Sequence, residues 1–135
     1  MDLRRNGLGP HGAAALATLR ALPRLQVLHL DLRNNALTPA GVEALAALHT
    51  ASTLGTLNLD LGSNHVGSSG VEALAGLRQS AVLHTLRLGL ESTGIRSSGA
   101  QALGQLRDAP RLQTLVLDLG GNWIGDNGAN ALTSL

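Results

Sequence analysis

The chain has 135 residues, enough for one domain with a sizeable core, and 30 of them are leucine, whereas phenylalanine, tyrosine and cysteine are absent. Ten basic residues against nine acidic ones give a net charge of +1, too small to predict nucleic acid or an acidic membrane surface as the partner. The lack of cysteine excludes disulfide bonds, a thiol nucleophile and thiolate metal ligands.

The predicted elements alternate between strand and helix along the chain. Residues 28–32 alternate apolar with polar side chains, so a strand is expected to bury its three leucines on one side and to direct His29 and Asp31 to the other. Residues 38–49 then carry apolar side chains at the spacing of one helix face, and Thr38, which precedes a proline, is typical of a helix start. The same order recurs near residues 57, 86 and 115.

These elements are internal repeats of 29 residues. We call a set of residues at equivalent positions of successive repeats a column. The glycine column is Gly12, Gly41, Gly70, Gly99 and Gly128, and the leucine column is Leu16, Leu45, Leu74, Leu103 and Leu132. One strand and one short helix cannot bury their apolar faces alone, but stacked repeats form a continuous core and a parallel sheet.

The unit Leu-x-x-Leu-x-Leu-x-Leu-x-x-Asn, followed by Gly-x-x-Ala-Leu in the helix, resembles the leucine-rich repeat. Its length is most similar to the ribonuclease-inhibitor-like class, although an added Asp-Leu pair lengthens the strand by two residues. The resemblance implies an α/β fold, a curved right-handed solenoid with parallel strands on the concave side and helices on the convex side. Residues 1–135 are expected to form a single array of about 4.6 repeats, uncapped at both ends and therefore a fragment of a longer array or assembly.

One polar column is expected to support the backbone. It consists of Asn6, Asn35, Asn64, Thr93 and Asn122. The family implies a ladder in which each buried amide bonds backbone groups of its own turn and of the neighbouring repeat, and a short side chain with both donors and an acceptor suits that role. Thr93 has only a hydroxyl group, so the third repeat is expected to be the weakest part of this ladder.

A second polar column lies on the strand side that faces away from the leucines. It consists of Asp2, Asp31, Asp60, Gly89 and Asp118. Strands about 4.8 Å apart bring like charges together unless cations intervene, and Arg4, Arg33 and Arg87 are available on the same face. Two interpretations stay open: a charge-balanced, solvent-exposed face, or an acidic stripe that binds a basic partner.

Trp123, the only aromatic residue, stands in a column whose other members are small or polar. Its indole either folds over the gap at Gly94 or anchors a protein partner. The third repeat departs most from the others, which marks either sequence drift or a working site. The candidate partner-binding residues are therefore His29, Asp31, Asn58, Asp60, Arg87, Glu91, Asp118 and Trp123.

No phosphate-binding glycine loop, metal-ligand spacing or catalytic triad pattern is present, and we expect no catalytic residue, cofactor or metal. The sequence favours a non-catalytic module that binds a protein partner on its concave strand face and turn ridge, without nucleic-acid binding or membrane insertion. One alternative is a passive scaffold subunit of a large multiprotein complex, with contacts at Arg20, Arg78 and Arg107. Another is part of a GTPase-activating or sensor protein. The absence of cysteine and of a signal-peptide-like start predicts an intracellular, cytoplasmic location.

Overall fold

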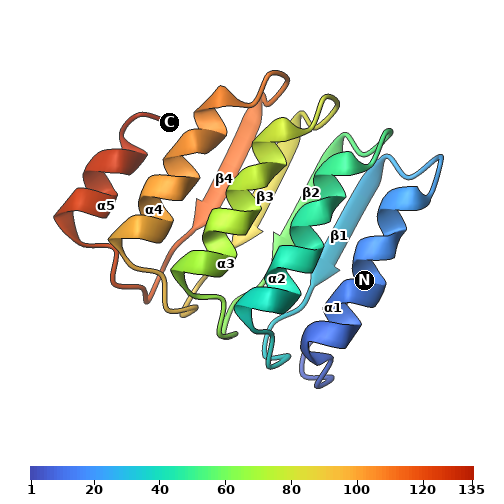
Figure 1. Cartoon of the computed structure of the whole chain (residues 1–135), viewed down its shortest axis with the longest axis horizontal. Coiled ribbons are helices and arrows are strands. Elements are labelled where there is room, and N and C mark those ends of the chain that lie inside the picture. Colours follow the sequence, from blue (N-terminus) through green and yellow to red (C-terminus); the bar gives the residue numbers. More distant parts are fainter.

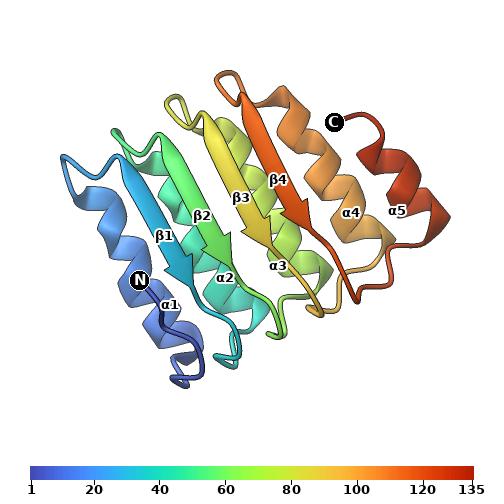
Figure 2. The same cartoon turned by 180° about the vertical axis from the view of Figure 1, so that it is seen from behind.

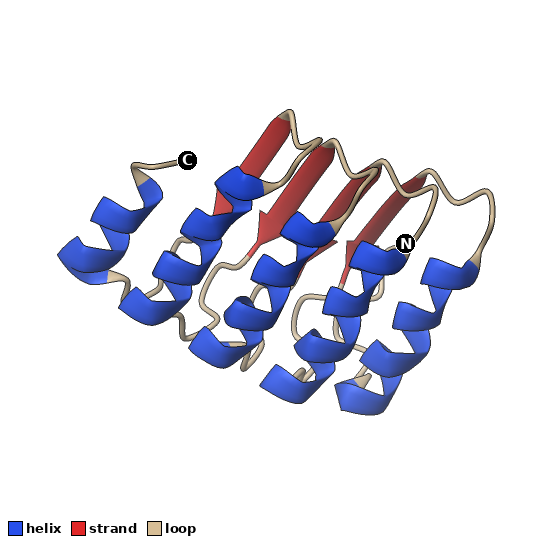
Figure 3. Cartoon of the chain, turned by 45° about the horizontal axis from the view of Figure 1, so that its top comes forward, coloured by secondary structure: helices blue, strands red, loops and turns tan.

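The computed structural model describes residues 1–135 and has two layers, one of strands and one of helices (Figure 1). The strands are β1 (Val27–Asp31), β2 (Thr56–Asp60), β3 (Thr85–Gly89) and β4 (Thr114–Asp118). The helices are α1 (Gly9–Ala17), α2 (Pro39–Ala46), α3 (Gly67–Leu74), α4 (Ser97–Gly104) and α5 (Gly125–Leu132). Figure 2 shows that the helices leave the other face of the sheet uncovered, and Figure 3 shows the helices in a single row.

The four strands pair in parallel and in chain order, β1-β2-β3-β4. Each strand residue pairs with the residue 29 positions later, as Leu28 does with Leu57 and Leu57 with Leu86. Because the pairing register equals the repeat length, every column of the sequence becomes a row of neighbouring side chains across the sheet. The columns therefore give the layout of both faces of the sheet directly.

The core lies between the two layers and consists almost entirely of leucine. Strand residues alternate between buried and accessible, so that Leu57 and Leu59 of β2 are fully buried while the residues between them face outward. Val42 and Leu45 of α2 meet these leucines from the helix side and are also fully buried. Each such side chain contributes roughly 1.5–3 kcal/mol through burial. Uniform leucine layers explain how the chain folds without core aromatic residues.

The helices are short, and the first four continue into 3₁₀ turns at Thr18–Ala21, Ala47–Thr50, Ala75–Gln79 and Gln105–Asp108. Thr38 does precede the first residue of α2, as expected, although its side chain makes no capping hydrogen bond. Hydroxyl groups instead connect repeats: Ser97 donates a hydrogen bond of 2.8 Å to the carbonyl of Ile124, in the next repeat. None of the helices combines the length and apolar character needed to cross a bilayer.

Candidate functional site

The uncovered side of the sheet, which we call the strand face, carries six of the eight candidate residues in two adjacent rows. One row runs through His29, Asn58, Arg87 and Val116, and the other through Asp31, Asp60, Gly89 and Asp118. Glu91 lies two residues beyond β3, and Trp123 lies in the turn between β4 and α5. We call the segments that join the end of each strand to the following helix the turn ridge. The candidate residues thus share one continuous surface.

In the first repeats, acids and arginines alternate across the strand face. The guanidinium of Arg33 donates from Nε to Asp31 Oδ1 at 2.9 Å and from Nη2 to Asp31 Oδ2 at 2.6 Å. Its Nε also lies 3.3 Å from Asp60 Oδ2, in the next repeat. Arg4 repeats the arrangement, with Nη2 2.6 Å from Asp2 Oδ2 and Nε 3.4 Å from Asp31 Oδ2. We call this series, from Asp2 to Asp60, the acid–arginine ladder.

The ladder favours the charged form of Asp2 and Asp31. The side-chain hydrogen bond from Arg4 is the main cause that lowers the pKa of Asp2 from 3.8 to about 2. The hydrogen bond from Arg33 likewise lowers the pKa of Asp31, against a smaller opposing effect of burial. The same contacts raise the pKa of both arginines. These acids are therefore neutralised by the chain itself, and this part of the strand face is charge-balanced.

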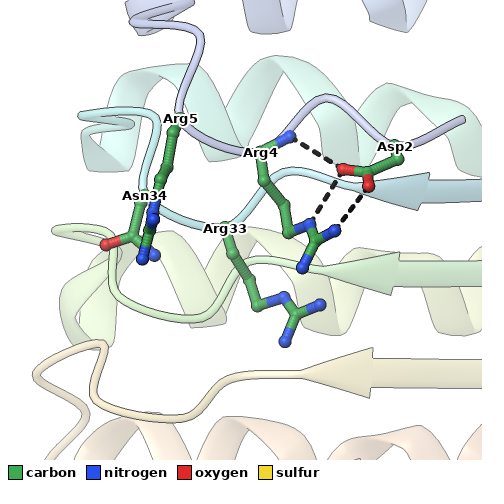
Figure 4. Close-up of a pocket in the computed structure, with 5 residues that line it drawn as sticks. All are labelled: Asp2, Arg4, Arg5, Arg33 and Asn34. Carbon is green, nitrogen blue, oxygen red and sulfur yellow. Dashed lines mark hydrogen bonds and ion pairs between the residues drawn. The ribbon is translucent and has the colours of Figure 1, made fainter.

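Beside the ladder lies an open hollow of about 400 Å³, lined by Asp2, Arg4, Arg5, Arg33 and Asn34. Figure 4 shows Arg4 held on Asp2, Arg33 next to it, and Arg5 alongside Asn34. Arg5 and Asn34 occupy the left-handed backbone position of their turns, with φ of 57° and 56°. No group of three or more histidine, aspartate or glutamate side chains anywhere in the chain is placed to hold a metal ion.

The ladder stops after Asp60. The column that supplies Arg4 and Arg33 continues as Gly62, Glu91 and Gly120. Asp118 makes no ion pair, and its Oδ1 accepts a hydrogen bond of 3.2 Å from the backbone N–H of Gly120. Arg87, which we expected to serve as a counter-ion, stands in the row of His29 and also forms no ion pair. Glu91, which follows β3, and Asp118 of β4 therefore have no ion-pair partner in the chain.

Trp123 is 82% exposed, so its indole points into solvent and does not fold over Gly94. The turns explain this. In the turns before α2 and α4, the column of Trp123 adopts the left-handed conformation, at Ala36 (φ 55°) and Gly94 (φ 79°). Trp123 does not adopt this conformation. Gly125 (φ 61°), the first residue of α5, adopts it instead, and the Trp123 N–H donates a hydrogen bond of 2.9 Å to the Ile95 carbonyl. An aromatic residue avoids positive φ, so this second kind of turn suits tryptophan.

The asparagine column forms a hydrogen-bonded ladder beneath the turn ridge. Asn64 Nδ2 donates to the carbonyls of Leu32 and Leu61 at 3.0 and 2.8 Å. Its Oδ1 accepts from the backbone N–H groups of Asn35 and Leu37 at 2.9 and 3.0 Å. Each amide thus joins two repeats, and no buried side-chain polar atom lacks a partner.

Thr93 interrupts this pattern. Its hydroxyl donates 2.7 Å to the carbonyl of Leu90 in its own turn, but it accepts nothing from the preceding repeat. The backbone N–H groups of Asn64 and Val66, both buried, consequently make no hydrogen bond. Asn122 restores the pattern one repeat later, where its Oδ1 accepts from Thr93 and Ile95 at 3.1 and 3.0 Å. The junction between the second and third repeats is therefore the one with fewer bonds.

The sequence reasoning missed two features of this surface. One is that glycine replaces the ladder arginine beside Asp60 and Asp118. The sequence signal for this was a change of motif, from Asp-Leu-Arg at residues 2–4 and 31–33 to Asp-Leu-Gly at residues 60–62 and 118–120. The other is the pair of turn types that orients Trp123. Its signal was glycine at positions 67 and 125, where the equivalent residues of the other two full repeats are Thr38 and Arg96.

Comparison with known families agrees with this geometry. The family model described as Leucine Rich repeat matches residues 27–46, 56–75 and 112–132, each of which begins on a strand or just before one and runs into the following helix. The chain thus contains leucine-rich repeats, and the predicted α/β leucine-rich-repeat solenoid is confirmed as its fold. A search of curated proteins found no match to the chain.

Proposed function

We propose that the chain is a non-catalytic interaction module that binds a protein partner through its strand face and turn ridge. Leucine-rich repeats generally mediate contacts between proteins. The observation that carries the proposal is the exposure of Trp123, whose large aromatic side chain is 82% accessible on a ridge next to an uncovered sheet. Buried apolar area at such residues dominates many interfaces, because a rigid ring covers much surface at low entropic cost.

The residues near Trp123 also favour the strand face and turn ridge as the binding surface. Val116, on the outward side of β4, is 40% exposed, and Asp118 follows it on the same strand. The strand nearest the tryptophan therefore offers both an apolar and a charged side chain, as interfaces with an apolar centre and a polar rim require. The 29-residue unit with its Gly-x-x-Ala-Leu helix leads us to include the ribonuclease-inhibitor-like class in the proposal. The absence of cysteine leads us to include an intracellular setting.

The helical face offers less to a partner, which argues against the scaffold alternative. Arg20 Nη1 donates to the carbonyl of Ala17 at 3.2 Å, and Arg78 Nη1 donates to that of Ala75 at 3.1 Å. These arginines therefore bond the ends of their own helices, where a positive charge is favourable. Arg107 lies next to Asp108, with Nε 3.5 Å from its carboxylate. Each predicted scaffold contact thus has a local partner.

The test uses photo-crosslinking, because the chain contains no lysine for amine-reactive reagents. A photoreactive amino acid is placed at Thr114, exposed on the strand face, or at Gln101, exposed on α4, and the chain is used to capture partners from cells. We expect a specific protein to be crosslinked from position 114 and not from 101. Trp123→Ala should weaken that complex about tenfold or more, whereas Arg107→Ala should leave it unchanged. Crosslinks confined to position 101 would contradict the proposal.

A further inference from the structure

The chain contains two Asn-Gly pairs, a dipeptide with a reactivity of its own. They are Asn6–Gly7, in the turn before α1, and Asn127–Gly128, within α5. The backbone nitrogen that follows an asparagine lies close to the side-chain amide carbon, so its attack on that carbon is intramolecular. Glycine permits the attack most readily because it has no Cβ atom to hinder the approach. Whether each pair reacts therefore depends on how firmly the fold holds the nitrogen and the amide.

The fold leaves the first pair unrestrained. Asn6 and Gly7 are both exposed, and the backbone N–H of Gly7 makes no hydrogen bond within the chain. Apart from its chain neighbours, no atom lies within 4 Å of the Cβ position of Gly7, so the turn is open there. The side chain of Asn6 makes one hydrogen bond, from Nδ2 to the carbonyl of Arg4 at 3.0 Å, and this bond lies at the surface.

The second pair is held by its helix. The backbone N–H of Gly128 donates a hydrogen bond of 3.2 Å to the carbonyl of Ile124, and Gly128 is buried against α4. Its nitrogen is therefore not available for attack on Asn127. The remaining members of the asparagine column are fixed through both Oδ1 and Nδ2, and none of them precedes a glycine; they are Asn35, Asn64 and Asn122.

We propose that Asn6 is a site of spontaneous deamidation, which converts it to isoaspartate and aspartate with water as the only co-reactant. The nitrogen of Gly7 forms a bond to Cγ of Asn6, and the side-chain amide leaves as ammonia, taking up the proton that the Gly7 nitrogen releases. The product is a five-membered succinimide ring, which water then opens. Cleavage between the nitrogen and the backbone carbonyl carbon gives isoaspartate, and cleavage between the nitrogen and Cγ gives aspartate.

The isoaspartate product disturbs the first step of the asparagine ladder. Asn35 Oδ1 accepts hydrogen bonds from the backbone N–H groups of both Asn6 and Leu8, at 2.9 and 3.3 Å. Isoaspartate adds one methylene group to the main chain between these two N–H groups, whereas aspartate leaves the length of the main chain unchanged. Because one oxygen fixes the spacing of the two donors, the longer chain loses one of the two bonds. Isoaspartate therefore loosens the turn before α1, and aspartate does not.

The test compares the two pairs in one sample. The full chain is incubated for days at mildly alkaline pH and digested with trypsin, which places the pairs in different peptides, residues 6–20 and 112–135. We expect peptide 6–20 to gain about 1 Da, as NH is replaced by O, and to separate into two products by chromatography. Asn127 should react about tenfold or more slowly. An unmodified Asn6, or equal rates at Asn6 and Asn127, would overturn the proposal.

Two variants separate the steps. Gly7→Ala gives the first repeat the Asn-Ala pair of residues 35–36, and the turn accepts alanine because Ala36 has φ 55° where Gly7 has 62°. Deamidation of Asn6 should slow about tenfold or more in this variant, and an unchanged rate would overturn the proposal. Asn6→Asp carries the new charge without the added methylene. It should keep the Leu8 amide protected from hydrogen exchange, whereas the isoaspartate form should lose that protection. Equal protection in both would overturn the role of the longer main chain.

Discussion

The two halves of the solenoid share one backbone plan but satisfy their polar groups differently. In the first half, Arg4 and Arg33 neutralise the acids of the strand face, and Asn35 and Asn64 bond the turns of two repeats each. In the second half, glycine and Glu91 replace the arginines, and Thr93 replaces one asparagine. The difference teaches that the fold and the surface charge depend on separate columns. The leucines are kept throughout the chain. The acids have arginine partners in the first half, whereas Glu91 and Asp118 have no ion-pair partner in the second.

The largest effect is expected from removal of a complete asparagine. Asn64→Ala deletes five side-chain hydrogen bonds and leaves the carbonyl of Leu61 and the backbone N–H groups of Asn35 and Leu37 without partners inside the protein. At about 1 kcal/mol or more for each lost bond, the free energy of unfolding should fall by about 3–5 kcal/mol. Urea unfolding followed by far-ultraviolet circular dichroism measures this. Asn6→Ala, at an exposed position of the same column, should cost about 1 kcal/mol or less, and an equal loss from both would contradict the ladder.

Thr93→Asn should make the second half resemble the first. The new amide oxygen would accept from the backbone N–H groups of Asn64 and Val66, which have no partner in the native chain. We expect the free energy of unfolding to rise by about 1–3 kcal/mol, measured by the same urea titration. Thr93→Val keeps the shape but removes the hydroxyl bond to Leu90, and should lower stability. A destabilised Thr93→Asn variant would show that the junction is not short of acceptors.

The acid–arginine ladder should make stability depend on pH. The pKa values of Asp2 and Asp31 are lower in the folded chain than the ordinary 3.8, so their ion pairs stabilise the fold fully above that value. The stabilisation is lost as pH falls from about 4 towards 2, where Asp2 becomes protonated. The melting temperature measured across this interval should therefore drop, and the drop should be shallower in Asp31→Asn. A variant with the same pH profile as the native chain would argue against the ladder.

The smallest effect is expected from an extension of the ladder by one step. Gly62→Arg places a guanidinium two residues after Asp60, as Arg33 follows Asp31, and the added Cβ meets only flexible side-chain atoms at 3.3 Å. Exposed ion pairs contribute little, so the gain should be about 0.5 kcal/mol or less and should vanish in 1 M salt. Gly62→Gln, with a neutral side chain of similar reach, is the control. A gain that survives high salt would have a cause other than charge.

Much of the fold could be predicted from sequence because the repeat is regular. The alternation at 28–32 gave the strand and its buried face to within a residue of β1, and the 29-residue step gave the pairing register. The orientation of Trp123 could not be predicted, since it depends on which turn residue takes positive φ, and Ala36 adopts that conformation although it is not glycine. The pairing of Arg33 with two acids depends on side-chain conformation, which composition does not reveal. Arg87, one row away, looked equally suitable.

The central claim is that the face next to Trp123 binds a protein partner, and the chain offers a direct measurement of it. Trp123 is the only aromatic residue, so the intrinsic fluorescence of the chain reports on this side chain alone. With a tryptophan-free form of the captured partner, the account predicts that emission moves to shorter wavelength and that quenching by acrylamide falls as the indole leaves water. Saturable binding that leaves both the emission and the quenching of Trp123 unchanged would contradict it.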